Sequence, residues 1–142
     1  MTLLCAATKW EAQPLAKALR LTEGAPGVFE RSDGRVTLLK TGIGPENATL
    51  ALRRWRGAGS PAVAAGISAG FAGALQPGMR TGDIVCDLRG CDLDVVRKAR
   101  ETAELLGLRI HFGKMLHSDK VLSSPQEKTA LGRKERGSAV DM

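Results

Sequence analysis

One carboxylate near the start of the chain stands where it could do chemistry. Glu11 follows a short apolar run at residues 3–7 and falls in the first turn of a helix predicted over residues 11–19. A carboxylate in that position can take a proton from water. The alternative is structural, because the positive end of the helix dipole stabilises an acidic side chain in the first turn.

Two glycine-bearing segments are candidate binding loops. Gly42 and Gly44 lie just ahead of Pro45, and proline is favoured at the first position of a helix. These glycines could bring backbone N–H groups and a helix N-terminus toward an anion or a water, although two-glycine turns are also common in plain loops. The second segment, residues 68–75, carries two glycines at short spacing.

The elements that must position these residues alternate between strands and helices. Strands are predicted at residues 3–7, 28–31, 35–40, 62–67, 84–86 and 108–114, and from residue 138. Helices are predicted at residues 11–19, 45–56, 92–106 and 125–133. The strand at residues 62–67, made of small residues, is expected to be buried, and the helix at residues 92–106 is expected to direct one apolar stripe inward: Leu93, Val96, Ala99, Ala103 and Leu106. This order predicts an α/β fold of three layers with a mixed, largely parallel central sheet, in a single domain over residues 1–142. Ligands of such sheets bind at the carboxyl ends of the strands, where both glycine segments lie.

The composition excludes several classes of protein. The net charge is +6, but the positive residues are scattered, and we expect no specific nucleic-acid partner. The densest cluster, residues 53–56, predicts a solvated helix face around one buried Trp55. Three irregularly spaced cysteines predict free thiols, with neither a disulfide framework nor a metal site, and no cofactor is expected. No segment approaches the roughly 18 apolar residues of a membrane span, and no signal peptide is evident, so we expect a cytoplasmic protein.

Six short segments, taken in order, resemble the nucleoside phosphorylase and nucleosidase superfamily. They are residues 6–12, 39–44, 70–75, 82–85, 117–119 and 139–142. The superfamily includes methylthioadenosine/S-adenosylhomocysteine nucleosidases, futalosine hydrolases and hopanoid-associated phosphorylases. The double-glycine block and the stretch at residues 124–128 look closest to the hopanoid-associated group.

The resemblance implies cleavage of the N-glycosidic bond of a purine nucleoside, with adenine as the base. This reaction passes through a cationic, oxocarbenium-like sugar, and Glu11 matches the glutamate that activates the attacking water. The absence of a Gly-Asp-Pro-x-Arg segment favours water over phosphate, but Arg35, Lys40 and Arg80 stay open as phosphate ligands. The predicted substrate-binding residues are the loop glycines, the base-binding loop after the fourth strand, two residues that pack on the purine and the methionine under the sugar: Gly42, Gly44, Phe71, Ala72, Gly73, Val121, Leu122 and Met142.

Two departures from the family pattern affect the expected activity. The sequence stops at Met142, before the glutamate that holds the sugar hydroxyls and the aspartate that protonates the purine. The segment at residues 87–94 is also shorter than the family's usual loop. We therefore expect a domain truncated at its C-terminus, with impaired activity and with exposed apolar surface that favours a homo-oligomer. The alternative is a catalytically inactive remnant that binds nucleosides or another partner.

Overall fold

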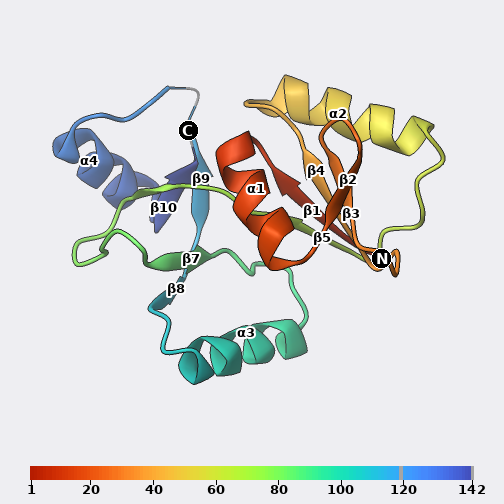
Figure 1. Cartoon of the computed structure of the whole chain (residues 1–142). Helices are drawn as coiled ribbons and strands as arrows, with labels where there is room; N and C mark the ends of the chain where they lie inside the picture. The colour runs from red at the N-terminus through yellow and green to blue at the C-terminus, as the bar shows by residue number, and fades with distance from the viewer. Residues whose placement is uncertain (119, 142) are drawn as a thin grey trace. The chain divides into compact units, whose positions relative to one another are not determined.

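The chain divides into two compact units, Met1–Phe71 and Ala72–Met142. The structure, a computed structural model, describes residues 1–118 and 120–141. Figure 1 labels the elements along the chain. The first unit has two hydrophobic clusters and the second unit has one.

The first unit is built on a five-stranded sheet with the order β2-β3-β4-β1-β5. Strand β1 pairs in parallel with β4 on one side and with β5 on the other, whereas β2 and β3 join as antiparallel strands. The sheet is therefore mixed, as predicted, with its parallel strands around β1. The strands are β1 (Thr2–Ala6), β2 (Thr22–Ala25), β3 (Val28–Glu30), β4 (Val36–Lys40) and β5 (Ala65–Ser68).

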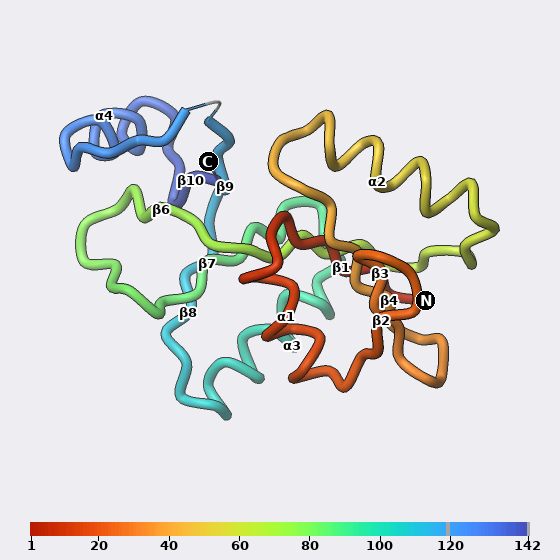
Figure 2. The backbone as a smooth tube through the Cα atoms, turned by 45° about the horizontal axis from the view of Figure 1, so that its top comes forward, coloured from red at the N-terminus to blue at the C-terminus, as the bar shows by residue number. Residues whose placement is uncertain are grey.

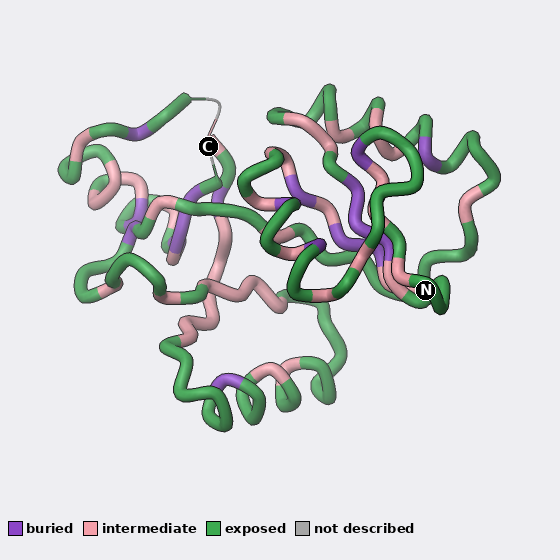
Figure 3. The backbone as a smooth tube through the Cα atoms, viewed as in Figure 1, coloured by how far each residue is buried: buried purple, intermediate pink, exposed green. Residues whose placement is uncertain are grey.

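Helices α1 (Lys9–Ala18) and α2 (Pro45–Gly57) cover opposite faces of this sheet. Side chains alternate between the two faces of a strand, so β1 contributes to two cores. Leu4 packs with Ala12 of α1, whereas Leu3 packs with Trp55 of α2. The predicted three layers are thus present in the first unit, and Figure 3 shows the buried segments along β1 and β4.

The start of α1 has a reciprocal cap. Thr8 is the N-cap residue, and its side chain accepts from the Glu11 backbone while the Glu11 side chain accepts from the Thr8 backbone. Pro14 lies inside the same helix and has no N–H to donate to the carbonyl one turn back, that of Trp10.

The second unit has a three-stranded sheet, β6-β10-β9, and a two-stranded parallel sheet, β7-β8. A buried cluster of Leu75, Leu116, Leu122 and Val140 packs against Leu131 of α4. The elements of this unit are β6 (Gly73–Ala74), β7 (Ile84–Cys86), α3 (Leu93–Leu105), β8 (Ile110–Phe112), β9 (Met115–His117), α4 (Pro125–Glu135) and β10 (Ala139–Asp141).

Two predicted buried elements are exposed instead. Residues 65–68 of β5 are all exposed, because β5 is the edge strand and pairs only with β1. Helix α3 was predicted to bury Leu93 and Leu106, but these side chains are 84% and 63% exposed, and Ala103 is the buried residue of that stripe. A three-residue strand, β8, is too short to cover a helix of 13 residues, and Figure 3 shows α3 largely exposed.

Three further predictions can be compared directly with the structure. The three cysteines are free thiols, as expected. Trp55 is 7% exposed and its arginine neighbours are exposed, which confirms the prediction for that helix face. Among the described residues, no helix has the length and apolar character needed to cross a membrane.

Candidate active site

Three loops of the first unit meet at one edge of the sheet. Strands β1, β4 and β5 run in parallel, so their carboxyl ends lie at the same edge. The Thr41 N–H donates to the Ala6 carbonyl at 2.8 Å, the Gly42 N–H to the Ala7 carbonyl at 3.0 Å, and the Ala69 N–H to the Cys5 carbonyl at 2.9 Å. Figure 2 follows the chain from β1 into α1 and from β4 into α2. These two loops lead to opposite faces of the sheet, and such a divergence is where open α/β sheets usually place ligands.

Glu11 is held at this edge by both of its carboxylate oxygens. Oε2 accepts from the Thr8 N–H at 2.8 Å and from the Thr8 hydroxyl at 2.9 Å. Oε1 accepts from the Phe71 N–H at 3.0 Å, from a loop 60 residues further along the chain. A hydrogen bond therefore connects Glu11 of α1 with Phe71 of a distant loop, and both are predicted site residues.

Gly70 makes this approach possible. A Cβ atom at this position would lie 2.6 Å from Oε1 of Glu11 and 3.2 Å from its Cδ. Any larger residue would push the carboxylate away from the Phe71 backbone. Gly70 is therefore required by close contact, since its φ angle is not among the positive values.

The environment keeps Glu11 ionised. Partial burial by itself would raise the pKa of the carboxyl, but hydrogen bonds from the Phe71 N–H, from the Thr8 N–H and hydroxyl, and from the Ala7 backbone outweigh it and hold that pKa below the ordinary 4.5. At neutral pH the side chain is thus a fixed negative charge. Such a group can orient a water and stabilise a positive charge that develops beside it.

The loop between β4 and α2 contains the predicted residues Gly42 and Gly44. Gly42 and Gly44 have φ angles of 86° and 88°, which favour glycine. A Cβ on Gly42 would also lie 3.0 Å from the Cβ of Asn47. Gly44 is the N-cap of α2, has no side chain to cap that helix, and is followed by Pro45 as predicted.

The remaining predicted residues belong to the second unit and are described within it. Ala72 is exposed, Gly73 begins β6, and Val121 is 74% exposed. Leu122 is 6% exposed and is part of the core of that unit. Met142 lies outside the described residues.

The two open phosphate ligands of the first unit, Arg35 and Lys40, do not face Glu11. Arg35 precedes β4 and lies at the opposite end of that strand from Gly42; its guanidinium faces Asp33 at 4.0 Å. The Lys40 side chain runs against Gly27, where a Cβ would lie 3.6 Å from its Cε. Arg80 is in the second unit, where its backbone N–H donates to the Asp83 carboxylate at 3.0 Å.

A separate polar cluster surrounds Asp83 in the second unit. The carboxylate is 7% exposed and lies 2.8 Å from Nε2 of His111 and 3.4 Å from the Arg109 guanidinium. The Arg80 N–H first, and then His111, hold the pKa of the Asp83 carboxyl below its ordinary value. These contacts tie the start of β7 to β8, which is a structural role.

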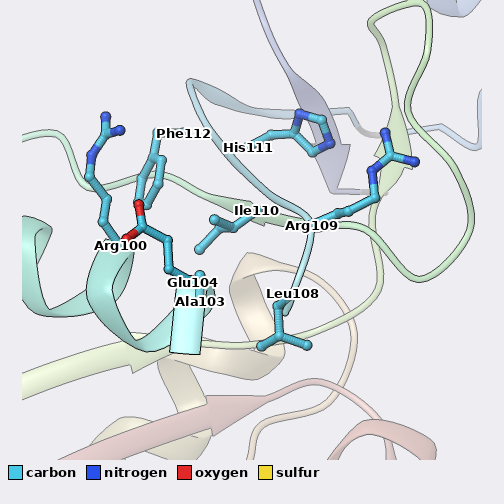
Figure 4. Close-up of a pocket in the computed structure, with 8 residues that line it drawn as sticks. All are labelled: Arg100, Ala103, Glu104, Leu108, Arg109, Ile110, His111 and Phe112. Carbon is cyan, nitrogen blue, oxygen red and sulfur yellow. The ribbon is translucent and has the colours of Figure 1, made fainter. Parts of the chain in front are cut away.

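A hollow of about 340 Å³ lies between α3 and β8 in the second unit, and none of the predicted site residues lines it. Figure 4 shows Arg100 beside Phe112 on one side of the strand, with Arg109 and His111 directed to the other. In the described part of the chain, His, Cys, Asp and Glu residues form no group of three that could hold a metal.

Solved structures of other proteins share the fold of this chain, although their sequences differ from it. No protein-family model and no curated protein matches the chain. A methylthioadenosine nucleosidase of Helicobacter pylori with 5'-methylthioadenosine in its active site aligns with a TM-score of 0.78 and 17% identity, over 99% of this chain and 74% of its own. The corresponding Campylobacter jejuni nucleosidase aligns with a TM-score of 0.73 and 19% identity, over 99% of this chain and 74% of its own. The futalosine hydrolase of H. pylori aligns with a TM-score of 0.74 and 17% identity, over 99% of this chain and 76% of its own. The chain therefore has the nucleosidase fold.

Sequence reasoning missed Thr8, which donates to Glu11, and the role of Gly70, which leaves room for the Glu11 carboxylate. Thr8 could have been found, because Thr-x-x-Glu ahead of a helix is the pattern of a capping box. Gly70 lay within a segment that was recognised, but its contact with Glu11 joins positions far apart in the chain and has no local signal.

Proposed function

We propose that this chain cleaves the N-glycosidic bond of a purine nucleoside, with adenine as the base and water as the acceptor. The observation that carries the proposal is the Glu11 carboxylate, fixed at the carboxyl edge of the parallel strands by Thr8 and by the Phe71 backbone. The likeness to a nucleosidase that holds 5'-methylthioadenosine supports the choice of substrate. The closer resemblance to hopanoid-associated phosphorylases stays a prediction.

Glu11 acts in two stages in this mechanism. As the bond to the base lengthens, the sugar gains positive charge, and the ionised carboxylate stabilises it. The water that attacks the sugar becomes more acidic as its new bond forms, and Glu11 then takes the proton. The base leaves with the electron pair of the broken bond and takes up one proton from solvent, so that the net reaction adds one water across the bond. The lowered pKa of Glu11 makes it a weak base toward free water, so proton transfer comes late in the attack.

Water is favoured over phosphate as the acceptor. A phosphate dianion beside the Glu11 carboxylate needs cations to offset the repulsion between like charges. Arg35 is at the far end of β4 and Lys40 is directed against Gly27. The first unit therefore offers neither of these cations to a phosphate beside Glu11.

A second candidate function is binding of a nucleoside without turnover, which the fixed Glu11 carboxylate could also serve by accepting a hydrogen bond from the ligand. Adenine release from adenosine and from 5'-methylthioadenosine, measured with and without phosphate, tests both, with calorimetric binding in parallel. The first proposal expects release that does not depend on phosphate. Binding without release would support the second candidate, and a requirement for phosphate would contradict water as the acceptor.

The variant Glu11→Gln isolates the charge of the carboxylate. We expect adenine release to fall by about 100-fold or more, since general-base groups supply roughly 10²–10⁴. Glu127→Gln is the matched control, because Glu127 has the same third position in the capping box of α4. Equal rates for Glu11→Gln and Glu127→Gln would refute the assignment of Glu11.

A further inference from the structure

We propose that Thr8 is a positioning residue for Glu11, with its hydroxyl holding one carboxylate oxygen so that the other faces the reacting water. The inference deepens the proposed function and rests on it. It assigns to Thr8 a task beyond that of starting a helix.

The two oxygens of Glu11 are engaged differently. Oε2 receives both donors of Thr8, the N–H at 2.8 Å and the hydroxyl at 2.9 Å. A carboxylate oxygen accepts about two hydrogen bonds, so Thr8 occupies Oε2. Oε1 receives the Phe71 N–H at 3.0 Å. The Ala7 backbone also acts on this carboxylate, with the smallest effect of its donors. Oε2 thus has two close donors and Oε1 has one, so Oε1 has more room for the donor that a reacting water brings.

The Thr8 hydroxyl has two separable roles. Its oxygen accepts from the Glu11 N–H at 3.4 Å, which caps the helix. Its hydrogen is donated to Oε2 of Glu11 at 2.9 Å, which holds the side chain. The first role needs only an acceptor, and the second needs a donor. Different substitutions can therefore remove them separately.

The donor role has an electrostatic consequence. Hydrogen bonds to the ionised form of a carboxyl favour that form, and both donors of Thr8 act in this direction on the pKa of Glu11. Loss of the hydroxyl donor should raise that pKa and free the side chain to leave its place. A residue that only starts the helix would leave the titration of Glu11 unchanged.

Three variants separate the roles. Thr8→Ser keeps the acceptor and the donor. Thr8→Asp keeps an acceptor that is favoured at the N-cap, but it cannot donate to Glu11 and adds a like charge. Thr8→Val removes both. For each full-length variant, the Glu11 pKa is measured by carbon-13 NMR, the unfolding midpoint by urea, and adenine release as a function of pH.

We expect Thr8→Ser to retain the Glu11 pKa and the rate. Thr8→Asp should keep the helix cap but raise the Glu11 pKa, and it should lower the urea midpoint less than Thr8→Val does, because the lost donor also contributed stability above the Glu11 pKa. It should move the acid limb of the rate profile to higher pH and lower kcat by about 10- to 100-fold, since small misplacements cost about that much. Thr8→Val should show the same loss together with a lower midpoint. The KM should change little, because Thr8 is not expected to touch the substrate.

The outcomes distinguish this inference from the proposed function. If Glu11→Gln abolishes adenine release but Thr8→Val, which removes the hydroxyl without adding a charge, leaves the Glu11 pKa and the pH profile as in the wild type, Thr8 does not position Glu11. If Glu11→Gln has no effect on release, the proposed function fails whatever Thr8 does. A raised Glu11 pKa in Thr8→Asp with an unchanged kcat would also overturn the positioning role.

Discussion

Gly70→Ala is the substitution that most directly tests the geometry of the Glu11 site. The new Cβ would lie 2.6 Å from Oε1 of Glu11, and ordinary contact begins near 3.4 Å. The carboxylate must therefore retreat by about 0.8 Å, on the usual range of carbon–oxygen contacts. Because Oε1 already accepts from the Phe71 N–H at 3.0 Å, this retreat moves the bond toward the limit of hydrogen-bond range.

The cost follows from the bond that is lost. A hydrogen bond to a charged group contributes about 1.5–3 kcal/mol, and the lower end applies because Glu11 is only half-buried. The clash itself is inexpensive, since the end of a flexible side chain can move aside. We expect the free energy of unfolding to fall by about 1–2 kcal/mol. Adenine release should fall by about 10-fold or more, because a displacement of a catalytic group by about 1 Å can cost about that much in rate.

The assay is a urea titration together with adenine release, and Gly66→Ala is the control. Gly66 lies in β5, close to Gly70 in sequence, and a Cβ there would have no atom within 4 Å. Gly66→Ala should therefore leave both measurements near the wild-type values. The reasoning is refuted if Gly70→Ala and Gly66→Ala behave alike, or if the Glu11 pKa is the same in both.

Three other predictions concern pH, packing and association. Glu11 has a lowered pKa, so it contributes stability above its unfolded value of 4.5 and loses it as pH falls through the folded value. Urea titrations from pH 6 to pH 3 should thus show a shallower acid dependence in Glu11→Gln than in the wild type. Trp55→Ala should lower the free energy of unfolding by about 3–5 kcal/mol, because it removes a side chain that packs on Leu3. Arg56→Ala should lower it by under about 0.5 kcal/mol. Similar losses in the two variants would contradict the assignment of Trp55 to the core. Leu105 is 85% exposed, so we expect self-association in sedimentation that weakens in Leu105→Ser, and a wild-type monomer would contradict this.

Much of the first unit could be predicted from local patterns. The alternation of strands and helices, Pro45 at the start of α2 and the buried Trp55 all have signals in short windows of sequence. Strand β2 was missed because residues 22–25 are all exposed at the sheet edge and carry no apolar alternation. The proximity of Glu11 to Phe71 was expected from the shared edge of the parallel strands.

The second unit shows where periodicity fails. Leu93 and Leu106 fit the apolar stripe of a buried helix, yet they are exposed, because periodicity predicts a helix face and not the element that covers it. Strand β9 was missed since Met115–His117 pairs with β10, a strand more than 20 residues later in the chain, and has no signal of its own. The contact of Gly70 with Glu11 belongs to the same class of long-range information.

Pro14 makes the first turn of α1 depend on its cap. Without an N–H from Pro14, the Trp10 carbonyl lacks its helical partner, and that turn loses one of the bonds that would tie it to the rest of the helix. The turn that carries Glu11 can therefore fray while the rest of α1 stays folded. Such local opening would be visible as fast amide hydrogen exchange over residues 11–13. Each opening would briefly move the Glu11 carboxylate out of its hydrogen-bonded position without unfolding the protein.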